Sequence, residues 1–176
     1  VAVVGDDDYI VRQRAKEIYD GLLDDFPDDL SREIIDGRAD KVESVEHILQ
    51  EAKSAGGTLS LFGGGKLIWL NEINFLNQTK TGAAQGTKDT LDSFKSFVEG
   101  LEGTKIIISA CPVHRNHSFV KWLQKNSTYE DVAKQEKEDV AFRRLVEDTA
   151  KECGVSFARG AVDYLAAKIG AHPRLG

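Results

Sequence analysis

The chain has 176 residues, of which 41% are hydrophobic and 30% are charged, and its formal net charge is −6. This length fits one medium domain, or one domain and the start of another. No stretch approaches the roughly 20 consecutive apolar residues of a membrane span, and no signal peptide is evident. The two cysteines, Cys111 and Cys153, form no CxxC pair, so we expect both to be reduced thiols and not a disulfide. We therefore expect a cytoplasmic protein that makes no membrane contact.

The charge is uneven along the chain. Residues 1–50 contain 6 Lys and Arg against 14 Asp and Glu, a net charge of −8, which leaves +2 for the remaining residues. Binding to phosphates needs clustered cations. The acidic first part of the chain therefore excludes a nucleic-acid footprint there.

Alternating strands and helices are predicted along most of the chain. The first strand is expected over residues 1–4 and is followed by a helix with one apolar face over 9–23. A second strand and helix follow, and then a third pair. The apolar pattern places these later elements as strand 32–35, a helix from residue 42 to Gly56–Gly57, strand 66–73, helix 90–101, and 105–109 as a last apolar strand. Such alternation predicts an α/β fold, a parallel sheet with helices on both faces.

Two segments interrupt this pattern. Residues 77–89 lack an apolar period and predict an exposed connection. From Asp139 onward only helices are expected, over 140–153 and 157–169, and a domain boundary is placed near the charged stretch 130–138. We thus expect a domain over 1–134 and a partial helical domain over 135–176, which is too short for a core of its own and is expected to be cut short.

The loop between the first strand and the first helix reads Gly5, Asp6, Asp7, Asp8. A P-loop NTPase would bind phosphate at this place, with a second glycine and a Lys followed by Ser or Thr. Both are missing, and three carboxylates would repel a polyanion, so we expect no nucleotide and no other cofactor. The aspartates fit either a Mg²⁺ or Ca²⁺ site or, the favoured interpretation, capping of the helix.

Two further motifs have a functional and a plain structural interpretation. Gly63–Gly64–Gly65–Lys66 superficially resembles a phosphate loop, but a strand follows it directly, so we interpret it as a turn. Cys111, His114 and His117 have a spacing that could hold zinc, yet no fourth ligand is evident. A polar loop leading into a helix is the simpler interpretation, and no metal or catalytic residues are assigned.

Leu61 and Phe62, in the segment TLSLFGGG, are two large apolar residues beside three glycines. Apolar residues usually fold back into the core. The alternative is an exposed hydrophobic wedge that enters a pocket on a partner protein, because aromatic and aliphatic anchors are typical hot spots.

Three segments together resemble one family. VVGDDDYIVRQRA, SLFGGGKLIWL, and TKIIISACP followed by HRNHSFVKWLQKN are similar, in this order, to the delta subunit of the bacterial DNA polymerase III clamp loader, and residues from about 136 resemble the start of its helical lid. The resemblance implies an AAA+-like (P-loop-like) fold with a degenerate nucleotide site and no ATP hydrolysis of its own. It also implies that Leu61 and Phe62, with Ser60, bind and open the sliding clamp.

The partners that the resemblance implies are the sliding clamp (beta subunit) and the other loader subunits, tau/gamma and delta prime, with DNA reached indirectly through the complex. The family's collar domain, which holds the loader together, is absent after Gly176, so this fragment is expected to bind the clamp without assembling the loader. Two alternatives stay open, one of them an enzyme. One is a Mg²⁺-dependent P-loop-like NTPase or phosphotransfer enzyme that uses Asp6 to Asp8. The other is a receiver domain, which would need a phosphoacceptor Asp that LIWLNEI and KIIISACP do not offer.

Overall fold

The structure is a computed structural model that describes residues 1–57, 65–132, 138–158 and 160–162. The chain divides into two compact units, Val1–Ala133 and Lys134–Gly176, and each is described by itself. No helix within the described ranges is both long and apolar enough to cross a membrane.

The first unit contains a five-stranded parallel sheet with the strand order β2-β3-β4-β1-β5. Short edge strands lie on either side of three central strands. The strands are β1 (Ala2–Gly5), β2 (Arg32–Asp36), β3 (Leu67–Ile73), β4 (Lys105–Ala110) and β5 (Tyr129–Val132).

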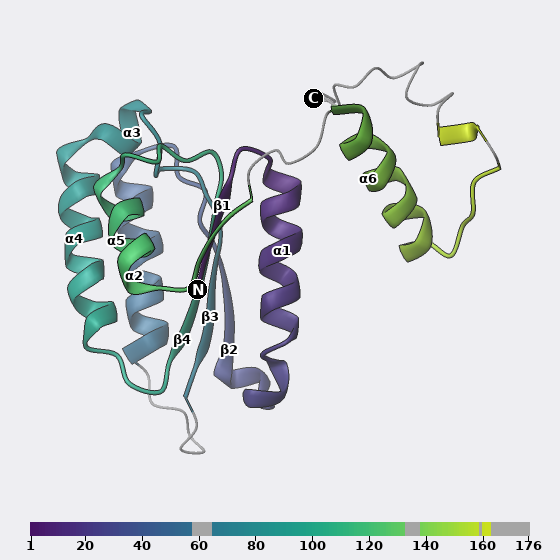
Figure 1. The fold of residues 1–176 in the computed structure, drawn as a ribbon. Helices are drawn as coiled ribbons and strands as arrows, with labels where there is room; N and C mark the ends of the chain where they lie inside the picture. Colours follow the sequence, from purple (N-terminus) through teal and green to yellow (C-terminus); the bar gives the residue numbers. More distant parts are fainter. Residues whose placement is uncertain (58–64, 133–137, 159, 163–176) are drawn as a thin grey trace. The chain divides into compact units, whose positions relative to one another are not determined.

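Helices cover both faces of this sheet, so the predicted α/β fold is confirmed. Helix α1 lies on one face, and α2, α4 and α5 lie on the other (Figure 1). The helices are α1 (Asp8–Asp20), α2 (Val42–Gly57), the short α3 (Lys80–Ala83), α4 (Gln85–Glu99) and α5 (Ser118–Asn126), with 3-10 turns at Leu23–Asp25 and Asp29–Ser31.

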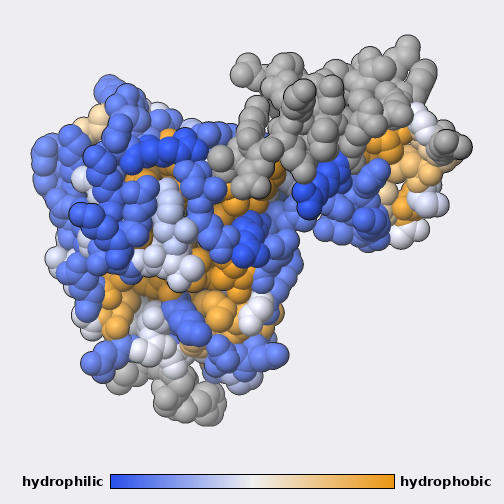
Figure 2. Space-filling model, viewed as in Figure 1, coloured by the Kyte–Doolittle hydropathy of each residue, from blue (hydrophilic) through white to orange (hydrophobic). Residues whose placement is uncertain are grey.

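The core forms two layers because successive strand residues point to opposite faces. On the α1 face, Val11, Ala15 and Tyr19 pack with one set of strand residues. The other set packs with α2, α4 and α5 around Phe94 and Phe119. Burial on both faces explains why the central strands are almost continuously apolar. On the side shown in Figure 2, the hydrophobic residues of this unit that reach the surface lie mainly between the helices. The outer sides of the helices are hydrophilic.

The prediction that 105–109 is the last strand is wrong, because β5 follows it. Strand β5 pairs in parallel with β1, with Ala2 opposite Tyr129 and Gly5 opposite Val132. Its sequence YEDV has no apolar period, and all four residues are only half-buried at the edge of the sheet. The sheet therefore extends into the stretch that the sequence analysis assigned to the domain boundary.

The prediction of an exposed connection over 77–89 is wrong in part. This segment contains α3 and the first turn of α4, which begins at Gln85 and not at residue 90. Polar contacts hold it: the Thr79 hydroxyl accepts a hydrogen bond from Gly82 N (3.0 Å), and the fully buried Thr87 donates to Thr81 O (2.7 Å). Hydroxyl groups replace apolar side chains here, so no hydrophobic pattern marks the helix.

In the second unit, helix α6 spans Glu138–Glu152, close to the expected 140–153. Residues 155–158 are not helical, whereas 161 and 162 are. The expected helix over 157–169 therefore begins too early, and most of it lies outside the described residues.

Candidate functional site at the carboxyl edge of the sheet

Open α/β sheets bind ligands outside the carboxyl ends of their strands. In this protein the ends of four of the five strands, β1, β2, β3 and β5, carry or adjoin charged residues, and carboxylates outnumber guanidinium groups among them. The carboxylates are Asp6, Asp7, Asp8, Asp36, Glu72 and Asp131, and the guanidinium groups that pair with some of them are Arg12, Arg38 and Arg115.

Asp7 is the N-cap of helix α1. Its backbone is extended (φ −121°, ψ 115°), and its side chain accepts a hydrogen bond from Ile10 N at 3.1 Å. The N-terminus of a helix after the first strand is where a phosphate would accept such hydrogen bonds. Here a carboxylate of the chain itself takes that place, which supports the capping interpretation for Asp7.

Arg115, in the loop before α5, joins the ends of two neighbouring strands at this edge, β1 and β5. Its guanidinium contacts Asp131 on β5 at 2.7 and 3.0 Å and Asp6 at 3.1 Å. Its hydrogen bonds to Asp131 and then Asp6 raise the pKa of Arg115 further above its usual range. The sequence analysis missed Arg115, because no spacing links three residues so far apart in the chain.

Gly5 has a packing role. A Cβ atom at this position would lie 2.7 Å from the Val132 carbonyl oxygen and 2.9 Å from Val11 Cγ2. Only glycine therefore lets β1 lie this close to β5 and to α1 at once. No phosphate is needed to explain the glycine.

The end of β3 is held by a buried hydroxyl. The β3–β4 register shifts between Leu70 and Ile73, and Glu72 lies there at a positive φ of 57°. Ser109, fully buried on β4, accepts hydrogen bonds from Trp69 Nε1 (3.0 Å) and Glu72 N (3.2 Å). This bend turns the Glu72 carboxylate to Arg12, with 3.1 Å between Oε1 and the guanidinium.

Cys111, His114 and His117 each have a local explanation. His117 caps α5, since its Nδ1 accepts a hydrogen bond from Phe119 N (3.2 Å), and His114 Nε2 lies 3.0 Å from Gln78 Nε2. Burial, and then Asp8, Asp7 and Asp6, raises the pKa of the Cys111 thiol to about 11. In the part of the chain that the structure describes, no group of three or more His, Cys, Asp or Glu is arranged to hold a metal ion.

This arrangement is unsuited to polyphosphate. The segment from Gly5 to Asp8 offers neither a Lys nor the Ser or Thr with which P-loop NTPases hold phosphate and Mg²⁺. The guanidinium of Arg115 is already paired with two carboxylates, and the carboxylates of Asp7 and Asp8 would repel an anion. At this edge, ion pairs within the chain therefore occupy the cationic groups that a phosphate would need.

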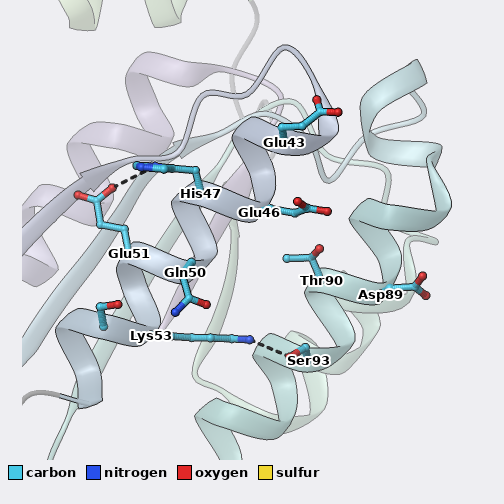
Figure 3. Close-up of a pocket in the computed structure, with 10 residues that line it drawn as sticks. Glu43, Glu46, His47, Gln50, Glu51, Lys53, Asp89, Thr90 and Ser93 are labelled. Atoms are coloured by element: carbon cyan, nitrogen blue, oxygen red, sulfur yellow. Dashed lines mark hydrogen bonds and ion pairs between the residues drawn. The ribbon is translucent and has the colours of Figure 1, made fainter.

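A separate open groove of about 830 Å³ lies between α2 and α4 (Figure 3). Lys53 reaches across from α2 to Ser93 on α4, with 2.8 Å between Nζ and Oγ. The other lining residues are largely acidic or polar: Glu43, Glu46, His47, Gln50, Glu51, Ser54, Asp89 and Thr90. An anionic ligand would be repelled from this groove as well.

Ser60, Leu61 and Phe62 lie outside the described residues. The residues on either side of their segment are described: Gly57 ends α2, and Gly65 precedes β3. Both lie at the amino edge of the parallel sheet, opposite the edge that carries Asp6 to Asp8.

Comparison with known proteins identifies the family. The model of the family "DNA polymerase III, delta subunit" matches residues 2–133. Among solved structures, the Bacillus subtilis DNA clamp loader delta protein (YqeN) is similar in fold, with a TM-score of 0.54 and 14% sequence identity over 94% of this chain. The chain spans about half of that protein's chain, 46%. No curated protein matches.

The match therefore covers all of the first unit except Val1, including the sheet and its charged carboxyl edge. It also confirms the resemblance that was seen in the three sequence segments. The chain belongs to the DNA polymerase III delta subunit family.

Proposed function

We propose that this chain is the clamp-binding part of a clamp loader delta subunit, which binds and opens the sliding clamp in DNA replication and hydrolyses no ATP itself. The family match over residues 2–133 carries this proposal. The name of the B. subtilis protein of similar fold, a DNA clamp loader delta protein, agrees with it.

The carboxyl edge supports the part of the proposal that concerns ATP. Gly5, Asp6, Asp7 and Asp8 stand where a phosphate loop would be, and we interpret them as its degenerate form. Asp7 accepts a hydrogen bond from one N–H group of the helix N-terminus, and Asp6 is paired with Arg115. A nucleotide would have to break these contacts and overcome like-charge repulsion.

Leu61 and Phe62, with the adjoining Ser60, form the proposed clamp-binding segment, residues 58–64. This segment joins α2 to β3 in a connection between two elements, and binding residues commonly lie on such connections. Burying each of the two large side chains in a pocket of the clamp would contribute about 1.5 to 3 kcal/mol.

The proposed partners follow from the family. They are the sliding clamp (beta subunit) and the loader subunits tau/gamma and delta prime, and DNA is reached indirectly through the complex. Residues 1–134 would form the AAA+-like clamp-binding domain, and residues 135–176 would begin the helical lid.

The test is clamp binding by a variant that lacks both anchors. The double substitution Leu61→Ala and Phe62→Ala is expected to weaken binding of the 176-residue chain to its cognate clamp about 100-fold or more, measured by surface plasmon resonance. Circular dichroism should show an unchanged fold.

A matched control removes two other large apolar side chains. Leu30 and Ile34 are 70% and 53% exposed at the β2 edge of the sheet, and the double variant Leu30→Ala and Ile34→Ala should keep full affinity. Unchanged clamp affinity of the Leu61/Phe62 variant, or equal losses in both double variants, would reject the proposed segment.

A further inference from the structure

Strand β2 forms an open edge of the sheet, because it pairs with β3 alone among the described strands. Gly37 N donates to Asn71 O on β3. In a parallel ladder, alternate residues direct both their N–H and their C=O groups to the same neighbouring strand. The backbone groups of Ile35 therefore face β3, and those of Ile34 and Asp36 face away from the sheet.

The same edge exposes apolar side chains. Ile34 is 53% exposed, and Leu30, in the turn before the strand, is 70% exposed. In the described part of the first unit, the third exposed large hydrophobic residue is Ile10 on α1. Outward backbone groups beside exposed apolar side chains are a template for a further strand.

Native edge strands commonly carry features that prevent such pairing, and β2 lacks several of them. Its five residues contain neither Pro nor Lys, and its register with β3 is continuous, without a bulge. The opposite edge of the sheet differs. Strand β5 carries the neighbouring carboxylates of Glu130 and Asp131, and its described residues expose no large hydrophobic side chain. Of the two edges, β2 is therefore the one that favours a further strand.

The side chains of β2 define which strand would match it. Arg32, Ile34 and Asp36 are two residues apart and lie on one face of the strand. A matching antiparallel strand has an acidic residue opposite Arg32, an apolar residue opposite Ile34 and a basic residue opposite Asp36. From its N-terminus, such a strand has a basic, an apolar and an acidic residue at alternate positions. This is the order in β2 itself.

We propose that the β2 edge is a self-association surface, on which β2 of a second copy pairs antiparallel with Ile34 opposite Ile34. The N–H of each Ile34 donates to the C=O of the other, and Arg32 of each copy faces Asp36 of the other. A register moved by two residues sets Ile34 against a charged residue. A register moved by four sets Asp36 against Asp36 or Arg32 against Arg32, and like charges directly opposite are destabilising.

The two charged groups keep capacity for a second partner. The guanidinium of Arg32 donates to the carbonyl oxygens of Leu23 and Phe26 and to Asp29, which leaves two of the five N–H groups of an arginine. The Asp36 carboxylate is 56% exposed although it is ion-paired within its own chain. Contacts within each copy thus hold both side chains in place for the pairing.

The first test is the mass of the 176-residue chain in sedimentation equilibrium. The mass should rise towards that of a dimer between about 10 µM and 1 mM, the range of a weak complex with a small interface. Ile34→Lys places a charge at the centre of the edge and should weaken association about 10-fold or more. Ile10→Lys makes the same change on α1 and should leave association unaltered. A monomer mass at every concentration, or equal losses in the two variants, would overturn the proposal.

A charge exchange tests the register. Asp36→Lys and Arg32→Glu should each associate about 10-fold more weakly alone, because like charges then face each other. A mixture of the two variants should associate as the unaltered chain does, since each presents the charge that the other needs. A mixture no better than its components would overturn the proposed register.

Hydrogen exchange of the unaltered protein decides the matter if Arg32→Glu does not fold. The N–H groups of Ile34 and Asp36 should exchange more slowly as the protein concentration rises, because both become hydrogen-bonded in the dimer. Unchanged exchange at these two positions would contradict the pairing. The proposal does not depend on the proposed function, because clamp binding is tested separately by the Leu61/Phe62 variant.

Discussion

The carboxylate of Asp7 accepts a 3.1 Å hydrogen bond from the backbone N–H of Ile10 and so satisfies one of the free N–H groups at the N-terminus of α1. In a nucleotide-binding relative of this fold, a phosphate would use such N–H groups. A carboxylate of the chain itself thus accepts a hydrogen bond that, in a phosphate loop, the ligand would accept.

Replacing this cap should destabilise the fold. Asp7→Ala removes the acceptor for Ile10 N and is expected to lower the free energy of unfolding by about 1 kcal/mol, measured by urea denaturation. Asp7→Asn keeps a good N-cap and should differ little from the unaltered protein. Equal losses in both variants would mean that charge, and not capping, is what Asp7 provides.

Mg²⁺ and ATP should leave the protein unchanged. A ligand at 100 times its Kd would add about 2.7 kcal/mol of stability, so binding would be visible as a rise in Tm. We expect no rise and no heat in calorimetry. Saturable heat that disappears when Asp6, Asp7 and Asp8 are changed to Asn would instead support the Mg²⁺-dependent NTPase or phosphotransfer alternative.

Cys111 should be alkylated slowly. Its pKa of about 11 reflects burial and the nearby Asp8, Asp7 and Asp6, so at pH 8 only about 0.1% of it is thiolate, the reactive form. Iodoacetamide should modify the exposed Cys153 first, as followed by peptide mass spectrometry. The Cys111 rate should rise with pH up to about 11, and Asp8→Asn should accelerate it at pH 8.

Comparable rates for the two cysteines at pH 8 would contradict this environment of Cys111. An Asp8→Asn variant that labels no faster would show that Asp8 does not contribute to the raised pKa of Cys111. Exposed Asp20, far along α1, offers a matched control: Asp20→Asn should leave the Cys111 rate unchanged.

Ser109→Ala should be costly for so small a change. It leaves the Trp69 indole N–H and the Glu72 N–H without their acceptor in a buried place, which costs about 1 to 3 kcal/mol. Denaturation followed by tryptophan fluorescence measures this. Ser44→Ala, which removes an exposed hydroxyl bonded to Asp40, should change stability by less than about 0.5 kcal/mol. Similar values for both variants would mean that Ser109 does not hold the bend at Glu72.

Much of the fold could be predicted from hydrophobic periodicity. Strands such as β3 and β4 are buried on both faces and read as apolar runs, and α2 has its buried residues on one side. Strand β5 and helix α3 could not be found in this way. Both are held by polar contacts, such as Arg14 to Glu130 (2.7 Å) and Thr79 to Gly82, which leave no periodic signal.

The candidate site, too, could be predicted from the sequence only in part. By itself, the sequence determined that the first loop has three aspartates and no phosphate-binding Lys, because composition and spacing within one segment are local properties. The tertiary structure decided that Arg115 pairs with Asp6 and Asp131, and that Gly65 meets Gly103. These contacts join residues far apart in the chain, and only the pairing of parallel strands brings them together.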